Sequence, residues 1–140
     1  NRELPSPFIN RYAWHLETQL NVNLMHRAAW RLIGEHDFAS FMASGSPVEE
    51  SVRRIERLDL TREGDIIETR IWADGFLYKM IRIIMGTLAG VGRGDIAVAD
   101  VTDILKAKDR TKAGPTAPPE GLCLVRVDYD VSERSGPTGG

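Results

Sequence analysis

The stretch that decides the fold runs from residue 75 to residue 88 and reads Gly75-Phe76-Leu77-Tyr78-Lys79-Met80-Ile81-Arg82-Ile83-Ile84-Met85-Gly86-Thr87-Leu88. From residue 76 to residue 91, apolar side chains fall on nearly all sides of a helix rather than on one stripe. A helix of this kind is buried between layers of a protein or against another domain. Asp74-Gly75 predicts a turn before it, and Gly92-Arg93-Gly94 predicts its end. We therefore expect a buried central helix over residues 76–91.

Strands and amphipathic helices are predicted on both sides of this helix. The patterns indicate strands over 11–16, 51–61, 66–73 and 122–130, helices over 22–33 and 99–108, and a short helical turn over 36–41. Residues 62–65 have the composition of a hairpin turn between the second and third strands. Within 66–73 one face should be buried, namely that of Ile67, Thr69, Ile71 and Ala73, and the other partly exposed, namely that of Glu68, Arg70 and Trp72. The order predicts an α+β fold, a mainly antiparallel sheet covered on one face by helices, close to a ferredoxin-like or RRM-like arrangement.

Composition and length limit the class of protein. The 140 residues, 42% hydrophobic and 27% charged, suit one domain, which we place at 11–131 between a proline-containing linker at 1–10 and a disordered tail at 132–140. The formal charge of -2 gives no overall basic character, so any RNA contact has to come from a local patch. A single cysteine, Cys123, excludes an internal disulfide and a cysteine zinc cluster. The sequence has no apolar run of the roughly 18 residues that a membrane span needs. Together, these features predict a cytoplasmic protein without a membrane partner.

Arg82 is the most informative residue, because it interrupts the apolar helix with a permanent charge. Burying an arginine requires a paired anion or a bound phosphate. Gly86, one helical turn further on, leaves room for a close approach by another segment. Alternatively, Arg82 extends to the helix edge or pairs with a carboxylate of this same chain. The sequence pattern leaves both possibilities open.

Other chemistry has weaker support. The three histidines have no ligand spacing or cysteine partner, and no phosphate-binding glycine loop is present, so we expect neither a metal site nor a cofactor. Two groups of basic residues are either phosphate contacts or ordinary solvated surface: Lys106, Lys108, Arg110 and Lys112, and Arg53, Arg54 and Arg57. His36 is either a polar residue at the rim of a site or a cap of the preceding helix. Phe76 is either packed beneath a catalytic loop or part of the core.

Four motifs in order carry a family resemblance. Residues 75–88, with Val91-Gly92 after them, resemble the G-F-L-Y-x-M-V-R-x-x-x-G-T-L segment of TruA-type tRNA pseudouridine synthases. Similar in the same order are Gly34-Glu35-His36-Asp37-Phe38 with Ser40-Phe41, Ala107-Lys108-Asp109-Arg110, and Ala113-Gly114-Pro115-Thr116-Ala117-Pro118 with Gly121-Leu122. Together they extend over about residues 24 to 130. The resemblance implies half of a pseudouridine synthase fold.

The resemblance also implies a role for Arg82. Enzymes of this type convert uridine to pseudouridine at positions 38 to 40 of the tRNA anticodon stem-loop, as homodimers and without cofactor or metal. Their arginine at the place of Arg82 lies against the catalytic aspartate, which belongs to a Gly-Arg-Thr-Asp-Ala-Gly-Val-His type segment of the N-terminal half. That segment is not in this sequence, and Gly92-Arg93-Gly94-Asp95 lacks the residues that should follow it. The chain thus resembles the C-terminal half, with tRNA and an N-terminal half as partners, and it should be inactive alone.

The resemblance further implies that this half supplies one wall of the active-site cleft and part of the surface that contacts phosphates. We expect Phe76, Lys79 and His36 at the wall. For the tRNA contacts we expect the residues of the basic clusters, namely Lys106, Lys108, Arg110 and Lys112 with Arg53 and Arg54. The alternative is a non-catalytic RRM-like module that binds RNA or protein through its open sheet face, with Trp72 as its aromatic contact.

Overall fold

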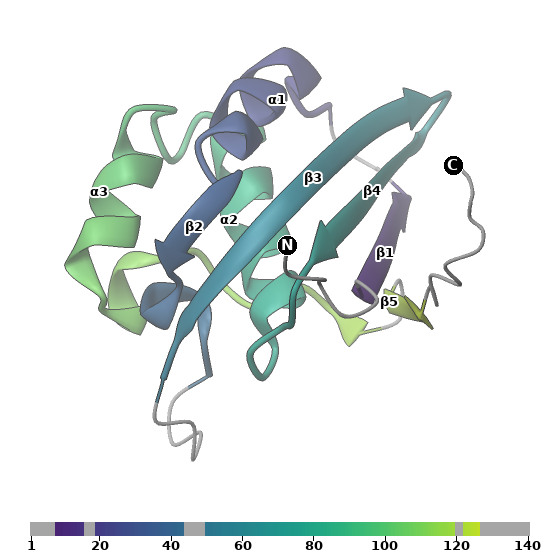
Figure 1. Cartoon of the computed structure of the whole chain (residues 1–140). Coiled ribbons are helices and arrows are strands. Elements are labelled where there is room, and N and C mark those ends of the chain that lie inside the picture. The colour runs from purple at the N-terminus through teal and green to yellow at the C-terminus, as the bar shows by residue number, and fades with distance from the viewer. Residues whose placement is uncertain (1–7, 16–18, 44–49, 120–121, 127–140) are drawn as a thin grey trace.

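A five-stranded antiparallel sheet with helices behind it forms the fold (Figure 1). It is seen in a computed structural model that describes residues 8–15, 19–43, 50–119 and 122–126. The described strands are β1 (Phe8–His15), β2 (Gly34–Asp37), β3 (Val52–Glu63), β4 (Ile66–Ala73) and β5 (Leu122–Arg126), in the sheet order β2-β3-β4-β1-β5. The helices are α1 (Val22–Trp30), α2 (Met80–Arg93) and α3 (Asp100–Ala107), with 3-10 turns η1 (Ala39–Phe41) and η2 (Arg110–Lys112). The predicted α+β class, with a mainly antiparallel sheet and helices on one face, is confirmed.

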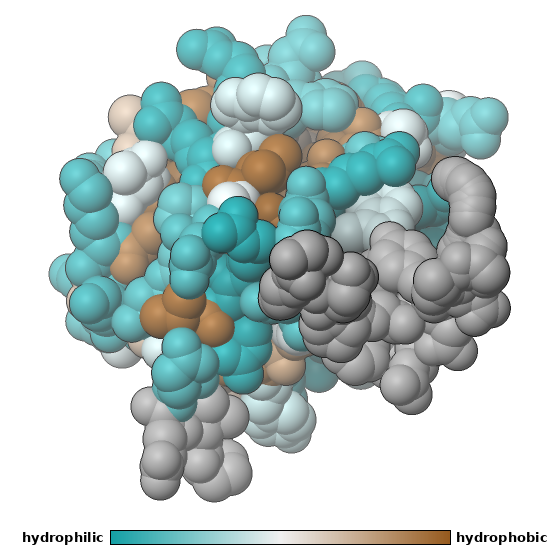
Figure 2. All heavy atoms as spheres, viewed as in Figure 1, coloured by the Kyte–Doolittle hydropathy of each residue, from teal (hydrophilic) through white to brown (hydrophobic). Residues whose placement is uncertain are grey.

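The alternation in β4 sets the two faces of the sheet. Ile67, Thr69, Ile71 and Ala73 are buried on the helix side, as predicted. The other face carries charges that pair with one another: Glu68 binds both Arg11 and Arg70. Hydrophilic residues also predominate over β3 and β4 in Figure 2, with apolar groups scattered between them. The sheet therefore has one packed face and one polar face.

Helix α2 is the centre of the core. Twelve of its fourteen residues are buried, because α1 packs along one side and the sheet along another. The helix begins at Met80, four residues later than predicted, since Lys79 has a left-handed backbone (φ 62°) that no α-helix accommodates. Residues 75–79 form a turn in which Tyr78 O accepts a hydrogen bond from Ala43 N (3.1 Å). Arg82 consequently lies in the first turn of α2 and not in the middle of a helix.

The predicted helical turn over 36–41 is wrong in part. Residues 34–37 form the edge strand β2, which pairs with residues 52–55 of β3, and only Ala39–Phe41 are helical. Residues 127–130 of the last predicted strand, the predicted tail at 132–140 and residues 1–7 of the predicted linker lie outside the described residues. No helix among the described residues has both the length and the apolar composition to cross a membrane.

A loop packs unusually close to α2. A Cβ atom added at Gly86 would lie 1.6 Å from Pro115 O, so only glycine fits beneath this loop. Gly114 N donates to Thr87 Oγ1 (2.9 Å), and Ala117 N donates to Arg82 O (2.9 Å). These contacts fix residues 114–117 against the first two turns of α2.

Ser40 connects three segments through one buried hydroxyl. Its Oγ donates to Ile104 O of α3 (2.6 Å) and accepts from Asp109 N (2.8 Å). Ser40→Ala leaves both backbone groups without this partner, so we expect the free energy of unfolding in urea to fall by about 1 to 3 kcal/mol. As a control, Thr102→Ala removes an exposed hydrogen bond from Arg31 and should change the free energy of unfolding by no more than about 0.5 kcal/mol. Equal effects of the two substitutions would contradict the connecting role of Ser40.

Candidate functional site

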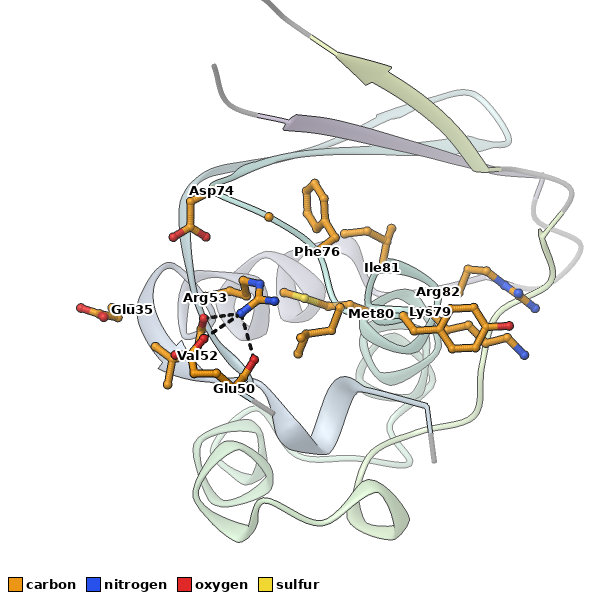
Figure 3. A pocket seen from close by; sticks show the side chains of 13 residues that line it. Glu35, Glu50, Val52, Arg53, Asp74, Phe76, Lys79, Met80, Ile81 and Arg82 are labelled. Carbon is orange, nitrogen blue, oxygen red and sulfur yellow. Dashed lines mark hydrogen bonds and ion pairs between the residues drawn. The ribbon is translucent and has the colours of Figure 1, made fainter. Parts of the chain in front are cut away.

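A groove of about 850 Å³ opens at the N-terminal end of α2 (Figure 3). One continuous segment, residues 74–82, forms most of its lining, and Glu35, Glu50, Val52 and Arg53 complete it. The turn before α2 therefore carries the first helical turn, and with it Arg82, into the same groove as the start of β3. The structure brings together four of the residues named from the sequence, which are Arg53, Phe76, Lys79 and Arg82.

Arg82 is half-buried and held at two points by Ala117. Its Nε donates to Ala117 O (2.7 Å), while its own carbonyl accepts from Ala117 N (2.9 Å). No carboxylate of the described residues forms an ion pair with Arg82. Pairing within the described part of the chain is thus not how this charge is neutralised. The guanidinium has a fixed direction, and its other N–H donors form no hydrogen bond with the described residues, which is an arrangement suited to an anion.

The helix terminus adds to the positive potential around Arg82. Arg82 is the third residue of α2, in the first turn, where Met80 N donates to Leu77 O (3.0 Å) and Lys79 gives no side-chain cap to the backbone N–H groups. These groups give the N-terminus of a helix a partial positive charge. Lys79 extends from the same end of the helix as Arg82, in the same direction (Figure 3). The side of the groove at α2 is therefore strongly cationic.

Arg53 lies on the opposite side of the groove and supports the turn before α2. Its Nη1 donates to Val52 O (2.7 Å) and to the Glu50 carboxylate (3.2 Å). Its Nε is 3.3 Å from where a Gly75 side chain would begin, so the guanidinium packs directly on that turn. Arg54, its neighbour, does not line the groove and pairs with Glu35 across β2 and β3 (3.4 Å). The two arginines therefore have different surroundings.

Phe76 and His36 differ in their relation to the groove. Phe76 is half-buried, lines the groove and packs against the core, which agrees with the core interpretation, while its packing beneath a catalytic loop stays a prediction. His36 is not among the lining residues. One of its ring nitrogens is 3.0 Å from Ile33 O, just after α1, and its ring meets Phe38 edge-on. The histidine thus holds the turn between α1 and β2.

The basic residues of the C-terminal part lie away from the groove. Arg110 donates to Gly114 O (2.9 Å) and Thr116 Oγ1 (3.1 Å), and so braces the loop that clamps Arg82. Lys108 is 3.9 Å from the Asp37 carboxylate, and Lys112 borders a hollow that also contains Asp95, Asp100 and Asp103. Lys106 is exposed on α3. These residues do not form one continuous basic surface with the groove.

Asp109 is a local cap rather than a member of the groove. Its carboxylate accepts from the hydroxyl (2.7 Å) and the backbone N–H (3.0 Å) of Thr111, and these hydrogen bonds lower the pKa of Asp109 below its ordinary value. Among the described residues, no three His, Cys, Asp or Glu side chains converge as metal ligands.

Comparison with known proteins gives the same family throughout. The family model described as tRNA pseudouridine synthase matches residues 28–130. The chain is 49% identical over 129 residues to tRNA pseudouridine synthase A of Thermoanaerobacter sp. (strain X514), covering 92% of this chain and 53% of the relative. For the same-named protein of Bacillus subtilis (strain 168) the identity is 48% over 126 residues, covering 90% and 51%. The chain thus spans about half the length of the curated relatives it matches. It belongs to the tRNA pseudouridine synthase family.

Proposed function

We propose that this chain is the half of a tRNA pseudouridine synthase that orients the catalytic aspartate, and that the aspartate itself comes from a segment outside this sequence. The observation that carries the proposal is Arg82, whose guanidinium is fixed by Ala117 at the cationic α2 side of the groove, without an ion-pair partner among the described residues. A charge held this way is stabilised when a carboxylate enters the groove. The sequence contains no Gly-Arg-Thr-Asp-Ala-Gly-Val-His type segment that could supply it.

The guanidinium would do two things for an aspartate. Charge-assisted hydrogen bonds from Arg82 would fix the direction of the carboxylate, and the positive charge would keep it ionised at neutral pH. The ionised aspartate then starts cleavage of the N1–C1′ bond of the target uridine. The uracil rotates, a C5–C1′ bond forms, the proton at C5 leaves and N1 gains a proton. The reaction is an isomerisation, so its atoms balance without a cofactor.

We propose tRNA as the substrate, with the uridine taken from positions 38 to 40 of the anticodon stem-loop in the cytoplasm by a homodimer. The sequence resemblance supports this assignment, as do the names of the relatives. The uridine has to leave its base stack to reach a carboxylate in the groove. Lys79 and Arg53, at opposite sides of the groove, are suited to contact the phosphates on either side of it.

The RRM-like alternative has less support. Modules of that kind stack bases on aromatic side chains of the open sheet face. The aromatic residue expected there, Trp72, is half-buried and covered by the Arg57 guanidinium, 4.4 Å from its ring. Arg57 in turn pairs with Asp59 (2.9 Å). The face is therefore already occupied by its own side chains.

Tritium release tests the proposed function. This chain should be joined to the part of the Bacillus subtilis relative that it does not match, and given tRNA labelled with tritium at C5 of uridine. We expect release of tritium to water, since the C5 proton leaves during isomerisation. Replacing the aspartate of the added part with alanine is the control and should abolish release. A folded fusion that binds tRNA without releasing tritium would contradict the proposal.

A further inference from the structure

A second cationic surface lies on α1, outside the groove. Trp30, the last residue of α1, is 75% exposed, more than any other large hydrophobic side chain among the described residues. It borders a shallow hollow with His26, Arg27, Arg31 and Val98. None of these residues lines the groove at Arg82. The hollow is therefore a separate feature of the surface.

Helix geometry explains why these side chains gather. Met25, Ala28 and Ala29 are the buried residues of α1. Residues three or four positions apart share a face, so Trp30 lies beside His26 and Arg27 on the opposite side. Single exposed apolar residues are common and mean little alone. The charges around the Trp30 ring are therefore what sets this surface apart.

The arginines around Trp30 differ from most of the other arginines whose side chains the structure describes. Six arginines form ion pairs with carboxylates in the described part: Arg11, Arg53, Arg54, Arg57, Arg70 and Arg93. Arg27 and Arg31 have no such pair there, and the hollow has no acidic lining residue. Arg31 Nη1 donates to Thr102 Oγ1 (3.0 Å), which directs this guanidinium along α3. Two uncompensated cations thus flank an open aromatic ring.

We infer that this hollow binds a nucleotide of the RNA substrate, with its base stacked on the Trp30 ring and its phosphates at Arg27 and Arg31. The inference rests on the proposed function, because it takes tRNA to be the ligand. Aromatic rings stack on any base, and a guanidinium matches phosphate geometry with two parallel hydrogen bonds. A protein partner is less well suited, since a stable protein interface buries about 800 Å² on each side and this surface offers one ring. RNA offers a base to stack on the Trp30 ring and phosphates to pair with the two arginines.

Binding of unmodified tRNA to the 140-residue chain tests the inference. We expect Trp30→Ala to weaken binding by about 10-fold and Trp30→Phe by much less, because phenylalanine keeps a stacking surface. Arg27→Gln with Arg31→Gln should reduce the slope of log K against log salt by about 1 to 2, one for each lost phosphate contact. Ile66→Ala and Arg62→Gln are matched controls, an exposed apolar residue and an exposed arginine at the β3–β4 hairpin, and should change neither quantity.

Each outcome decides the inference. Trp30→Ala binding as well as the unchanged chain, or glutamine variants with an unchanged salt slope, would overturn it and leave the proposed function intact. No tRNA binding by the unchanged chain would also overturn it, while tritium release by the fusion decides the function separately. If sedimentation shows a dimer that Trp30→Ala dissociates, the hollow is a contact between copies and the inference fails. The glutamine variants keep Trp30, so they remain informative if Trp30→Ala unfolds.

Discussion

Replacing Arg82 with alanine in the fused protein should lower kcat/KM for tritium release by about 100- to 1,000-fold, or roughly 3 to 4 kcal/mol of transition-state stabilisation. The loss is large because the aspartate would enter a half-buried groove without its counter-charge, and removing one partner of such a pair costs several kcal/mol. Arg82→Lys should recover only part of the lost activity. Lysine keeps the charge but cannot donate to Ala117 O and hold a carboxylate at two points.

Two controls separate this catalytic effect from loss of structure. Arg82→Ala removes one hydrogen bond to Ala117, so the free energy of unfolding should fall by only about 1 kcal/mol. Lys79→Ala removes a neighbouring exposed cation of the same groove and should lower kcat/KM by less than about 10-fold. Near wild-type activity of Arg82→Ala would contradict the proposal that Arg82 is the partner of the aspartate.

Gly86→Ala should be the most destabilising single methyl addition in α2. The new Cβ would lie 1.6 Å from Pro115 O, a backbone atom that cannot rotate away, so the loop has to move off the helix. We expect the free energy of unfolding to fall by about 3 kcal/mol, measured by urea denaturation of the 140-residue chain. The displaced loop includes Ala117, so the fused protein should lose activity through the direction of Arg82 as well.

Gly90→Ala is the matched control in the same helix. Its Cβ would lie 2.8 Å from Ile96 Cδ1, the end of a flexible side chain that can shift. Alanine also favours the helix by about 1 kcal/mol over glycine, which offsets the crowding, so we expect a change within about 1 kcal/mol. Equal stability of the two variants would show that the loop does not pack against Gly86 as described.

The sequence predicts the parts of the fold that depend on local pattern. The alternation from Ile67 to Ala73 predicted the correct buried face of β4, and the apolar run after Gly75 predicted a buried helix. The edge strand β2 was missed because Gly34-Glu35-His36-Asp37 has neither apolar alternation nor β-branched residues. Its pairing with β3 is imposed by the tertiary fold. The late start of α2 was also missed. The left-handed backbone of Lys79 ends the helix on that side, and nothing in a lysine indicates such a conformation in advance.

The candidate site was predictable in its key residue but not in its construction. Arg82 stood out as a charge in an apolar helix, and Gly86 indicated a close approach without saying by what. Ala117, 35 positions from Arg82, was not identified, because no periodicity relates a helix to the backbone of a distant loop. Arg53 and Arg54 were grouped as one basic cluster. Neighbouring residues of a strand point to opposite faces, and this rule could have separated the groove arginine from the surface one.

Tritium release by the 140-residue chain alone, at concentrations where the fused protein is active, tests most directly whether the catalytic aspartate lies outside this chain. Arg82 belongs to this chain, whereas the proposed catalytic aspartate belongs to another segment. We therefore expect no release from C5-labelled tRNA by the chain alone, even when the chain is folded and binds the tRNA. Measurable turnover by the chain alone would contradict the proposed division of the site, because a nucleophile would then have to lie within these 140 residues.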